Sequence, residues 1–234
     1  MKKMSKVLIS ILGVMLLGAG ALTWWWMERT ESLPPMSQSP TLSSQGVTRI
    51  VAFGDSLTAG YNLALDDAYP AQLERALQSR GYRVEVVNAG VSGETSAGGV
   101  RRASFIQSLE PDIVLLGLGG NDALRLLSPE ALEQNLAETI RTLKTGDPLP
   151  QILLLGMRAP ANADRTYRAA FDAVYPRIAR EFALPLIPFW LDGVALQPEF
   201  TLSDGIHPNQ AGYAKVIEGQ ILPALLPLLP ASAK

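Results

Sequence analysis

The chain contains one histidine, His207, within the segment TLSDGIHPNQ from Thr201 to Gln210. An imidazole can accept and return a proton near neutral pH, and a carboxylate beside it can fix its tautomer. Asp204 lies three residues before His207, which is close enough for that role in a tight loop. Pro208 favours an extended backbone at His207 and so helps to hold its side chain in place. Asp204 and His207 are therefore a candidate base with its orienting acid.

The group that such a base would activate is a serine hydroxyl, which attacks a carbonyl only weakly on its own. Ser56, in GDSLTAG (residues 54–60), follows a predicted buried strand and stands at a strand-to-helix turn. Its own backbone N–H can donate a hydrogen bond to the negative oxygen that develops during attack. We therefore expect nucleophilic acyl transfer with Ser56 as nucleophile, His207 as base and Asp204 as orienting acid.

Two further residues offer donors for this oxyanion. Gly93, in NAGVSGETSAGG (residues 88–99), has a bare backbone that a substrate can approach closely, and Asn121, in GLGGND (residues 117–122), has a side-chain amide. Structural interpretations stay open for each donor: a helix N-cap for Ser56, a positive φ for Gly93 and a turn cap for Asn121.

Charged residues near these segments have structural interpretations. We expect Asp55 and Asp122 to organise loops through hydrogen bonds, and Arg101 and Arg102 to lie on a solvated helix face. GLGGND begins like a dinucleotide-binding motif but lacks its last glycine, and GDSLTAG lacks the lysine of a P-loop, so nucleotide binding is poorly supported.

The elements that must position these residues alternate between short apolar runs and longer amphipathic segments. The predicted strands are Arg49–Phe53, Tyr82–Val87, Asp112–Leu118, Gln151–Met157 and Leu184–Phe189. The predicted helices are 66–81, Ser96–Leu109, 128–146, Arg165–Phe182 and a last one from after Pro208 to near Pro223. Such alternation indicates βαβ units, a parallel sheet and helices on both of its faces. Ligands of open sheets bind outside the carboxyl ends of the strands, and the candidate segments all follow strands.

Composition excludes several functional classes. The 234 residues include 20 basic and 22 acidic side chains, which gives no basic footprint for nucleic acid. There is no cysteine, so a thiol nucleophile, a cysteine metal site and disulfides are excluded. Hydrophobic residues make up 47%, which is typical of a globular protein with a core.

The N-terminal segment predicts export. Val7–Met27 carries no charge and, as a helix, would span roughly 30 Å, the thickness of a bilayer core. The basic residues before it favour a cytoplasmic N-terminus, so the rest of the chain should be extracytoplasmic or periplasmic and anchored to the cytoplasmic membrane. The alternative is a signal peptide cleaved near Ala21, which releases the domain.

These boundaries divide the chain into four parts. Residues 1–27 are the anchor or signal, and residues 28–46, rich in Ser and Pro, are a flexible linker. Residues 47–226 are the folded domain, and residues 227–234 are a C-terminal tail.

The four motifs GDSL, NAGVSGETS, GGND and DGIHP, in this order and spacing, resemble the blocks of the SGNH hydrolases, the GDSL esterase/lipase family. The resemblance covers the folded domain and is nearest to a bacterial subgroup of esterases variously called thioesterase I, lysophospholipase L1 and arylesterase. It implies a flavodoxin-like three-layer α/β/α sandwich around a five-stranded parallel sheet. It also implies Ser56, Asp204 and His207 as the triad, with Gly93, Asn121 and the Ser56 N–H as oxyanion donors.

The resemblance further implies an esterase that cleaves carboxylic ester and thioester bonds of aryl esters, acyl thioesters or lysophospholipids. It implies no metal or cofactor, and we expect a monomer that binds a small-molecule or lipid ester. We expect Leu57 and Pro160 to contact the acyl chain. The alternatives are an envelope acyl or acetyl transferase or deacetylase with the same triad, and a non-catalytic flavodoxin-like binding domain.

Overall fold

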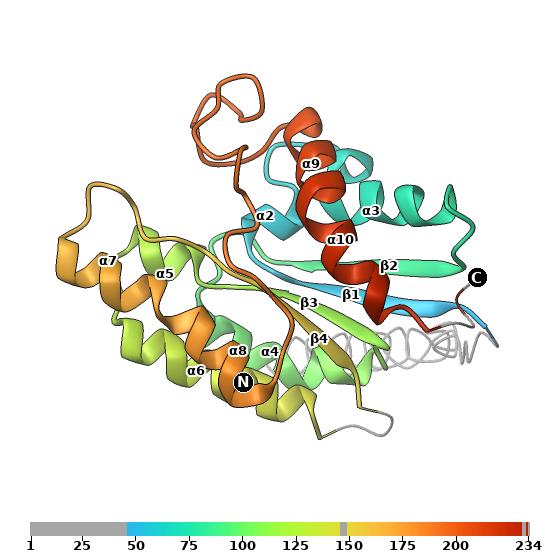
Figure 1. Ribbon diagram of the computed structural model, residues 1–234, viewed down its shortest axis with the longest axis horizontal. Coiled ribbons are helices and arrows are strands. Elements are labelled where there is room, and N and C mark those ends of the chain that lie inside the picture. Colours follow the sequence, from blue (N-terminus) through green and yellow to red (C-terminus); the bar gives the residue numbers. More distant parts are fainter. Residues whose placement is uncertain (1–45, 146–148, 231–232, 234) are drawn as a thin grey trace, which may run out of the picture. The chain divides into compact units, whose positions relative to one another are not determined.

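The structure is a computed structural model that describes residues 46–145, 149–230 and 233. Its sheet has five parallel strands in the order β2-β1-β3-β4-β5, the flavodoxin-like order (Figure 1). The strands are β1 Thr48–Gly54, β2 Val84–Gly90, β3 Ile113–Gly117, β4 Gln151–Leu155 and β5 Leu186–Ile187. The predicted parallel sheet of five strands is confirmed.

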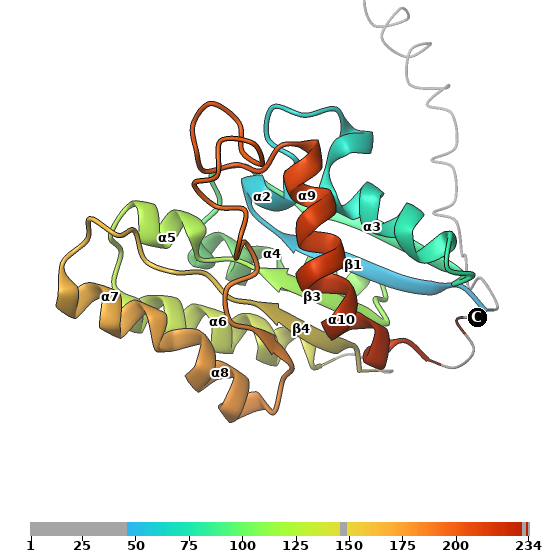
Figure 2. The same cartoon turned by 45° about the horizontal axis from the view of Figure 1, so that its top comes forward.

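Helices cover both faces of the sheet (Figure 2). They are α2 Ser56–Ala59, α3 Tyr69–Gln78, α4 Ser96–Ser108, α5 Gly120–Leu124, α6 Pro129–Leu143, α7 Arg165–Asp172, α8 Val174–Phe182, α9 Gln210–Val216 and α10 Leu222–Leu225. Short 3-10 turns lie at Leu65–Asp67 and Leu226–Leu228, and a π-helical turn lies at Ile217–Ile221.

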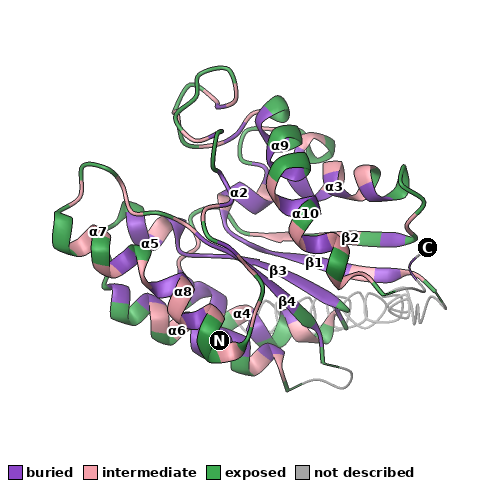
Figure 3. Ribbon diagram, viewed as in Figure 1, coloured by how far each residue is buried: buried purple, intermediate pink, exposed green. Residues whose placement is uncertain are grey.

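Alternating side chains of β1 enter two different hydrophobic cores. Ile50 and Ala52 pack against α3, α9 and α10 on one face, whereas Val51 and Phe53 pack against α4, α6 and α8 on the other. Strands β1 and β3 are buried along almost their whole length (Figure 3). A strand covered on both faces reads as a continuous apolar run, as both of these do. The predicted three layers are confirmed.

Prolines shape two helical regions differently from the prediction. The predicted helix Arg165–Phe182 is two helices, α7 and α8, that meet at Ala173. The ring of Pro176 would clash with the carbonyl of Asp172 in a continuous helix, which explains the break. The last helical region does not end near Pro223, because Pro223 falls in the first turn of α10, where its missing N–H costs little.

The second strand lies later than predicted because it pairs with the whole of β1. The register runs from Thr48 opposite Val84 to Gly54 opposite Gly90. The loops that follow β1 and β2 therefore lie at the same edge of the sheet.

The predicted anchor or signal, residues 1–27, lies outside the described residues, as does the predicted linker except Gly46. Within the described ranges, no helix is long and apolar enough to cross a membrane. At the other end of the chain, the carbonyl of Ala233 accepts a hydrogen bond from the Arg83 N–H at 2.6 Å.

Candidate active site

Ser56, His207 and Asp204 form one hydrogen-bonded chain. Ser56 Oγ lies 2.8 Å from His207 Nε2, and His207 Nδ1 lies 2.7 Å from Asp204 Oδ2. The side chain of His207 is 15% exposed and that of Asp204 is 34% exposed. The structure thus brings together residues that are distant in the sequence, since Ser56 and His207 are 151 positions apart. The geometry is that of a serine hydroxyl, an imidazole base and an orienting carboxylate.

Local hydrogen bonds hold the loop that carries Asp204 and His207. Asp204 Oδ1 accepts hydrogen bonds from the N–H groups of Ile206 at 2.9 Å and His207 at 3.0 Å. The His207 carbonyl accepts from the Leu202 N–H at 2.8 Å. Gly205 sits between them with a φ of 69°, a conformation that glycine adopts without steric cost.

The electrostatic state of Asp204 suits its position. Burial acts to raise the pKa of Asp204, but the hydrogen bonds from His207 and from the Ile206 N–H outweigh it and lower the pKa below its ordinary value. The carboxylate is therefore ionised at neutral pH, as an imidazole partner requires.

Ser56 is the first residue of the short helix α2. Its N-cap is Asp55, whose side chain accepts a hydrogen bond from the Leu57 N–H at 3.0 Å, so the interpretation of Ser56 as the N-cap is wrong. The helix packs closely on β2, because a Cβ at Gly90 would lie 2.1 Å from the backbone nitrogen of Ala59. Glycine at position 90 is thus what allows α2 to approach the strand.

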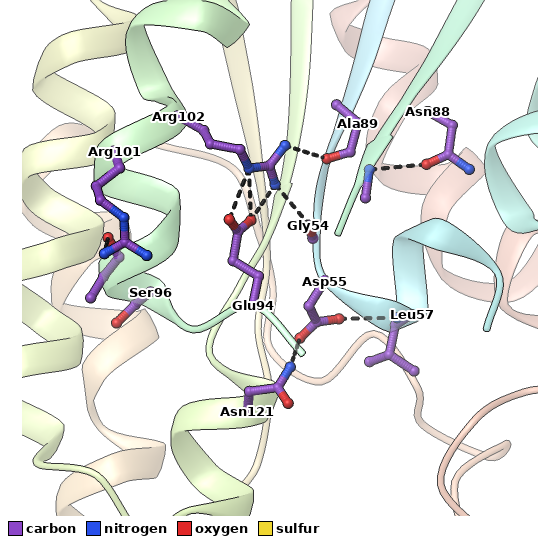
Figure 4. Close-up of polar contacts among 12 residues, drawn as sticks. Gly54, Asp55, Leu57, Asn88, Ala89, Glu94, Ser96, Arg101, Arg102 and Asn121 are labelled. Carbon is purple, nitrogen blue, oxygen red and sulfur yellow. Dashed lines mark hydrogen bonds and ion pairs between the residues drawn. The ribbon is translucent and has the colours of Figure 1, made fainter. Parts of the chain in front are cut away.

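The two predicted oxyanion donors come from the loop after β2 and from helix α5. Gly93 follows β2 with a φ of 80°, and its carbonyl accepts a hydrogen bond from Arg125 Nη2 at 2.9 Å. Asn121 lies in α5, where its Nδ2 donates to Asp55 Oδ2 at 3.3 Å (Figure 4). Arg125 caps the end of the same helix, so α5 is hydrogen-bonded both to the Gly93 loop and to the residue before Ser56.

The buried aspartate next to Asn121 faces a different partner. Asp122 accepts hydrogen bonds from the backbone N–H of Ser96 at 2.8 Å and from its hydroxyl at 2.6 Å. Asn135 in turn donates to the Ser96 hydroxyl at 2.9 Å. These contacts tie α4, α5 and α6 together, which is the loop-organising role expected of Asp122.

Arg102 does not lie on a solvated face, so that prediction is wrong. It pairs with Glu94, and its guanidinium also donates to the carbonyls of Ala89 at 3.0 Å and Gly54 at 3.3 Å (Figure 4). Arg102 therefore links the ends of β1 and β2 to the loop that carries Gly93. A pairing over eight residues between a loop and a helix has no local sequence pattern, which is why the prediction missed it. Arg101, by contrast, is exposed.

Tyr61 is a neighbour of the site that the sequence interpretation did not single out. Its ring centroid lies 4.5 Å from that of His207, with 36° between the ring planes. A tyrosine just after a predicted turn carries no pattern that would reveal this contact.

The two residues expected to contact an acyl chain differ in how far they are exposed. Leu57 is 5% exposed and packs in a hydrophobic core, which leaves little of its side chain for a substrate. Pro160 is half-buried in the loop after β4. Across the described ranges, no three or more His, Cys, Asp or Glu side chains are grouped to hold a metal ion.

Comparison with known proteins shows the family of the chain. Residues 52–215 match the GDSL-like Lipase/Acylhydrolase family. The chain belongs to this family. It is 40% identical over 171 residues to the thioesterase 1/protease 1/lysophospholipase L1 of Escherichia coli (strain K12), a match that covers 73% of this chain and 80% of that relative. The predicted family membership is confirmed.

Two further similarities extend the comparison. The arylesterase of Vibrio mimicus is 34% identical over 168 residues, covering 71% of this chain and 83% of the relative. The crystal structure of TesA superposes with a TM-score of 0.72 at 38% identity, covering 78% of this chain and all of that one. The protein is accordingly an ester-hydrolysing enzyme, as predicted.

Proposed function

We propose that the protein is a serine esterase that hydrolyses carboxylic ester and thioester bonds through an acyl-enzyme intermediate. The observation that carries this proposal is the continuous chain from Ser56 Oγ through the His207 imidazole to Asp204, with contacts of 2.8 and 2.7 Å. An activated nucleophile with a base and an orienting group within hydrogen-bond reach is the signature of covalent catalysis.

The first half of the reaction acylates Ser56. Its oxygen attacks the acyl carbonyl carbon, His207 Nε2 takes the hydroxyl proton, and the carbonyl electron pair moves onto the oxygen. Asp204 stabilises the imidazolium that forms. The tetrahedral intermediate then collapses, the bond to the leaving alkoxide or thiolate breaks, and Nε2 supplies that group with its proton.

The second half releases the acid. Water enters as nucleophile, His207 Nε2 takes one of its protons, and the new tetrahedral intermediate expels Ser56, which recovers its proton from the imidazolium. The proposed oxyanion donors in both halves are the backbone N–H groups of Ser56 and Gly93 and the side-chain amide of Asn121. Each such donor is worth about 10²–10³ in rate.

The substrate class follows from the names of the relatives. They are a thioesterase and lysophospholipase and an arylesterase, so we propose aryl esters, acyl thioesters and lysophospholipids as substrates. Pro160 is the proposed contact for the acyl chain. We also propose that the domain acts outside the cytoplasm, because Val7–Met27 is uncharged and preceded by lysines.

The test is hydrolysis of p-nitrophenyl esters from acetate to palmitate by the full-length chain, with Ser56→Ala and His207→Ala beside it. We expect each variant to lose about 10³-fold or more in kcat. Ser104→Ala, an exposed serine on α4, is the matched control and should keep full activity. An inert full-length chain, or a Ser56→Ala variant with near wild-type kcat, contradicts the proposal.

A further inference from the structure

Asp55 carries a buried carboxylate directly beside the proposed nucleophile. The residue is 2% exposed and lies between β1 and α2. A buried charge is costly unless hydrogen bonds compensate it. Both of its oxygens accept such bonds, Oδ1 from the Leu57 N–H at 3.0 Å and Oδ2 from Asn121 Nδ2 at 3.3 Å (Figure 4). This carboxylate therefore joins the helix of the nucleophile to the helix of Asn121.

The bond to Asn121 selects one orientation of an ambiguous side chain. The two ends of an amide have nearly the same shape, but only the NH₂ end can donate. An ionised carboxylate accepts only, so Asp55 binds the NH₂ end and leaves its second hydrogen for another acceptor. The hydrogen bond that Asp55 accepts from the Leu57 N–H caps α2, the helix that begins at Ser56.

The backbone around Asn121 is shaped to allow this contact. Gly119 has a φ of 113° at the start of α5, and Gly120 follows it. A Cβ at Gly120 would lie 3.0 Å from Asp55 Oδ2, closer than ordinary packing allows. The absence of a side chain at position 120 lets the start of α5 reach the carboxylate.

We propose that Asp55 is a positioning residue of the oxyanion hole. Its carboxylate turns the NH₂ of Asn121 toward the reacting carbonyl and, through the cap of α2, aligns the N–H of Ser56. This role rests on the proposed esterase mechanism. Asp55 itself transfers no proton and touches no reacting atom.

The charge state of Asp55 is compatible with this role. Burial raises the pKa of Asp55 to about 6, opposed by the hydrogen bonds from Leu57 and Asn121 and by the charge of His207. The carboxylate is thus ionised above neutral pH, where it accepts from Asn121 and also attracts the imidazolium that His207 forms during attack.

The first test is Asp55→Asn in the full-length chain, assayed with p-nitrophenyl esters at pH 8. The new side chain keeps an oxygen for the Leu57 N–H but presents a donor to the donor of Asn121, so the Asn121 amide must rotate. The oxyanion develops in the transition state and the tetrahedral intermediate but is absent from the bound ester, so we expect kcat to fall by about 10²–10³ while KM stays within about two-fold. An unchanged kcat overturns the proposal.

A double-mutant cycle separates positioning from a merely structural role. If Asp55 acts through Asn121, the Asn121→Ala variant has already lost the donor that Asp55 positions. Adding Asp55→Asn to that variant should then lower kcat by less than about three-fold. Full additivity of the two losses overturns the proposal. Asp112→Asn is the matched control, because its carboxylate accepts the Arg49 N–H at 2.7 Å at the opposite end of β1. We expect no change in kcat for that variant.

A second variant tests the proposal if Asp55→Asn does not fold. Gly120→Ala keeps both partners but adds a methyl group against the Asp55 carboxylate, and it should lower kcat without raising KM. A folded Gly120→Ala variant with wild-type kcat overturns the proposal. Ser56→Ala distinguishes a failure of the esterase mechanism from a failure of the positioning role. If Ser56→Ala stays active, the esterase mechanism itself fails. If Ser56→Ala is inactive but the double-mutant cycle is additive, only the positioning role of Asp55 is rejected.

Discussion

The two halves of the candidate active site are built in different ways. The nucleophile turn, residues 54–60, is largely buried and lies between β2 and the carboxyl end of β3. The histidine loop, residues 196–208, is largely exposed and is held by hydrogen bonds among its own residues, such as those that the Ile206 and His207 N–H groups donate to Asp204. The nucleophile turn is positioned mainly by its packing in the interior, and the histidine loop mainly by hydrogen bonds among its own residues.

The difference predicts how each half responds to mutation. Protein interiors are densely packed and adjust little, so a substitution that adds atoms there lowers the stability of the fold. A surface loop held by its own hydrogen bonds opens at little cost to the rest of the fold. Substitutions in the nucleophile turn should therefore lower stability together with activity, whereas those in the histidine loop should lower activity alone.

The largest effect should come from Asp204→Asn in the histidine loop. The amide keeps an oxygen for the Ile206 and His207 N–H groups but turns a donor toward His207 Nδ1, which favours the wrong tautomer. We expect kcat to fall by about 10³–10⁴ with the midpoint of thermal unfolding nearly unchanged. Steady-state kinetics and a thermal melt measure both, and Ser203→Ala is the neighbouring control. A large loss of stability would break the contrast between the two regions.

Gly90→Ala should be the most destabilising change beside the nucleophile turn. The added Cβ would lie 2.1 Å from the Ala59 nitrogen, so strand and helix must separate. We expect a loss of about 3 kcal/mol in the free energy of unfolding, measured by urea denaturation. Gly219→Ala is the matched control, because Gly219 has no atom within 4 Å of a new Cβ and no positive φ that would strain an alanine. Equal costs for the two variants would show that packing on α2 is unimportant.

Asp55 should make the stability of the domain depend on pH. Its pKa is raised from 3.8 to about 6 by burial, so the native state binds the proton more tightly than the unfolded chain. Its contribution to stability is complete below pH 3.8 and is lost as pH rises through 6, a change of about 3 kcal/mol. Comparing urea denaturation of wild type and Asp55→Asn from pH 4 to pH 8 isolates this contribution. Parallel pH profiles for the two proteins would refute it.

The smallest effect should come from Tyr61, which directly follows the nucleophile turn and contacts His207 of the histidine loop. Its ring lies beside His207, and an aromatic ring at that place would stabilise the imidazolium of the proposed mechanism. We expect Tyr61→Leu to lower kcat by about two- to five-fold, and Tyr61→Phe to retain wild-type kcat. Equal losses in both variants would point to the tyrosine hydroxyl instead of the ring.

Residue types and order along the chain were enough to predict the chemistry of the site. A single histidine must be the imidazole base if there is one, and its aspartate lies within the same short loop. Ser56, Gly93 and Asn121 each follow an apolar run that had to be a parallel strand, so their common edge followed from the alternation of elements. These inferences rest on local pattern and on the geometry of parallel sheets.

Contacts over long sequence separations were beyond such patterns. The link from Asp55 to Asn121, the pairing of Glu94 with Arg102 and the ring of Tyr61 on His207 all depend on how loops meet after folding. The break at Ala173 is different, because the sequence alone shows Pro176, whose ring would clash with the preceding turn of a continuous helix.

The sequence by itself therefore determined the sheet, the order of its elements and the identity of the groups at its carboxyl edge, because strand and helix periodicity and residue chemistry are local properties. Only the tertiary structure decided that Asp55 lies buried against Asn121 and that Arg102 links two strand ends to the Gly93 loop. The physical reason is that burial and hydrogen-bond partners are set by the packing of distant segments, which no short stretch of sequence encodes.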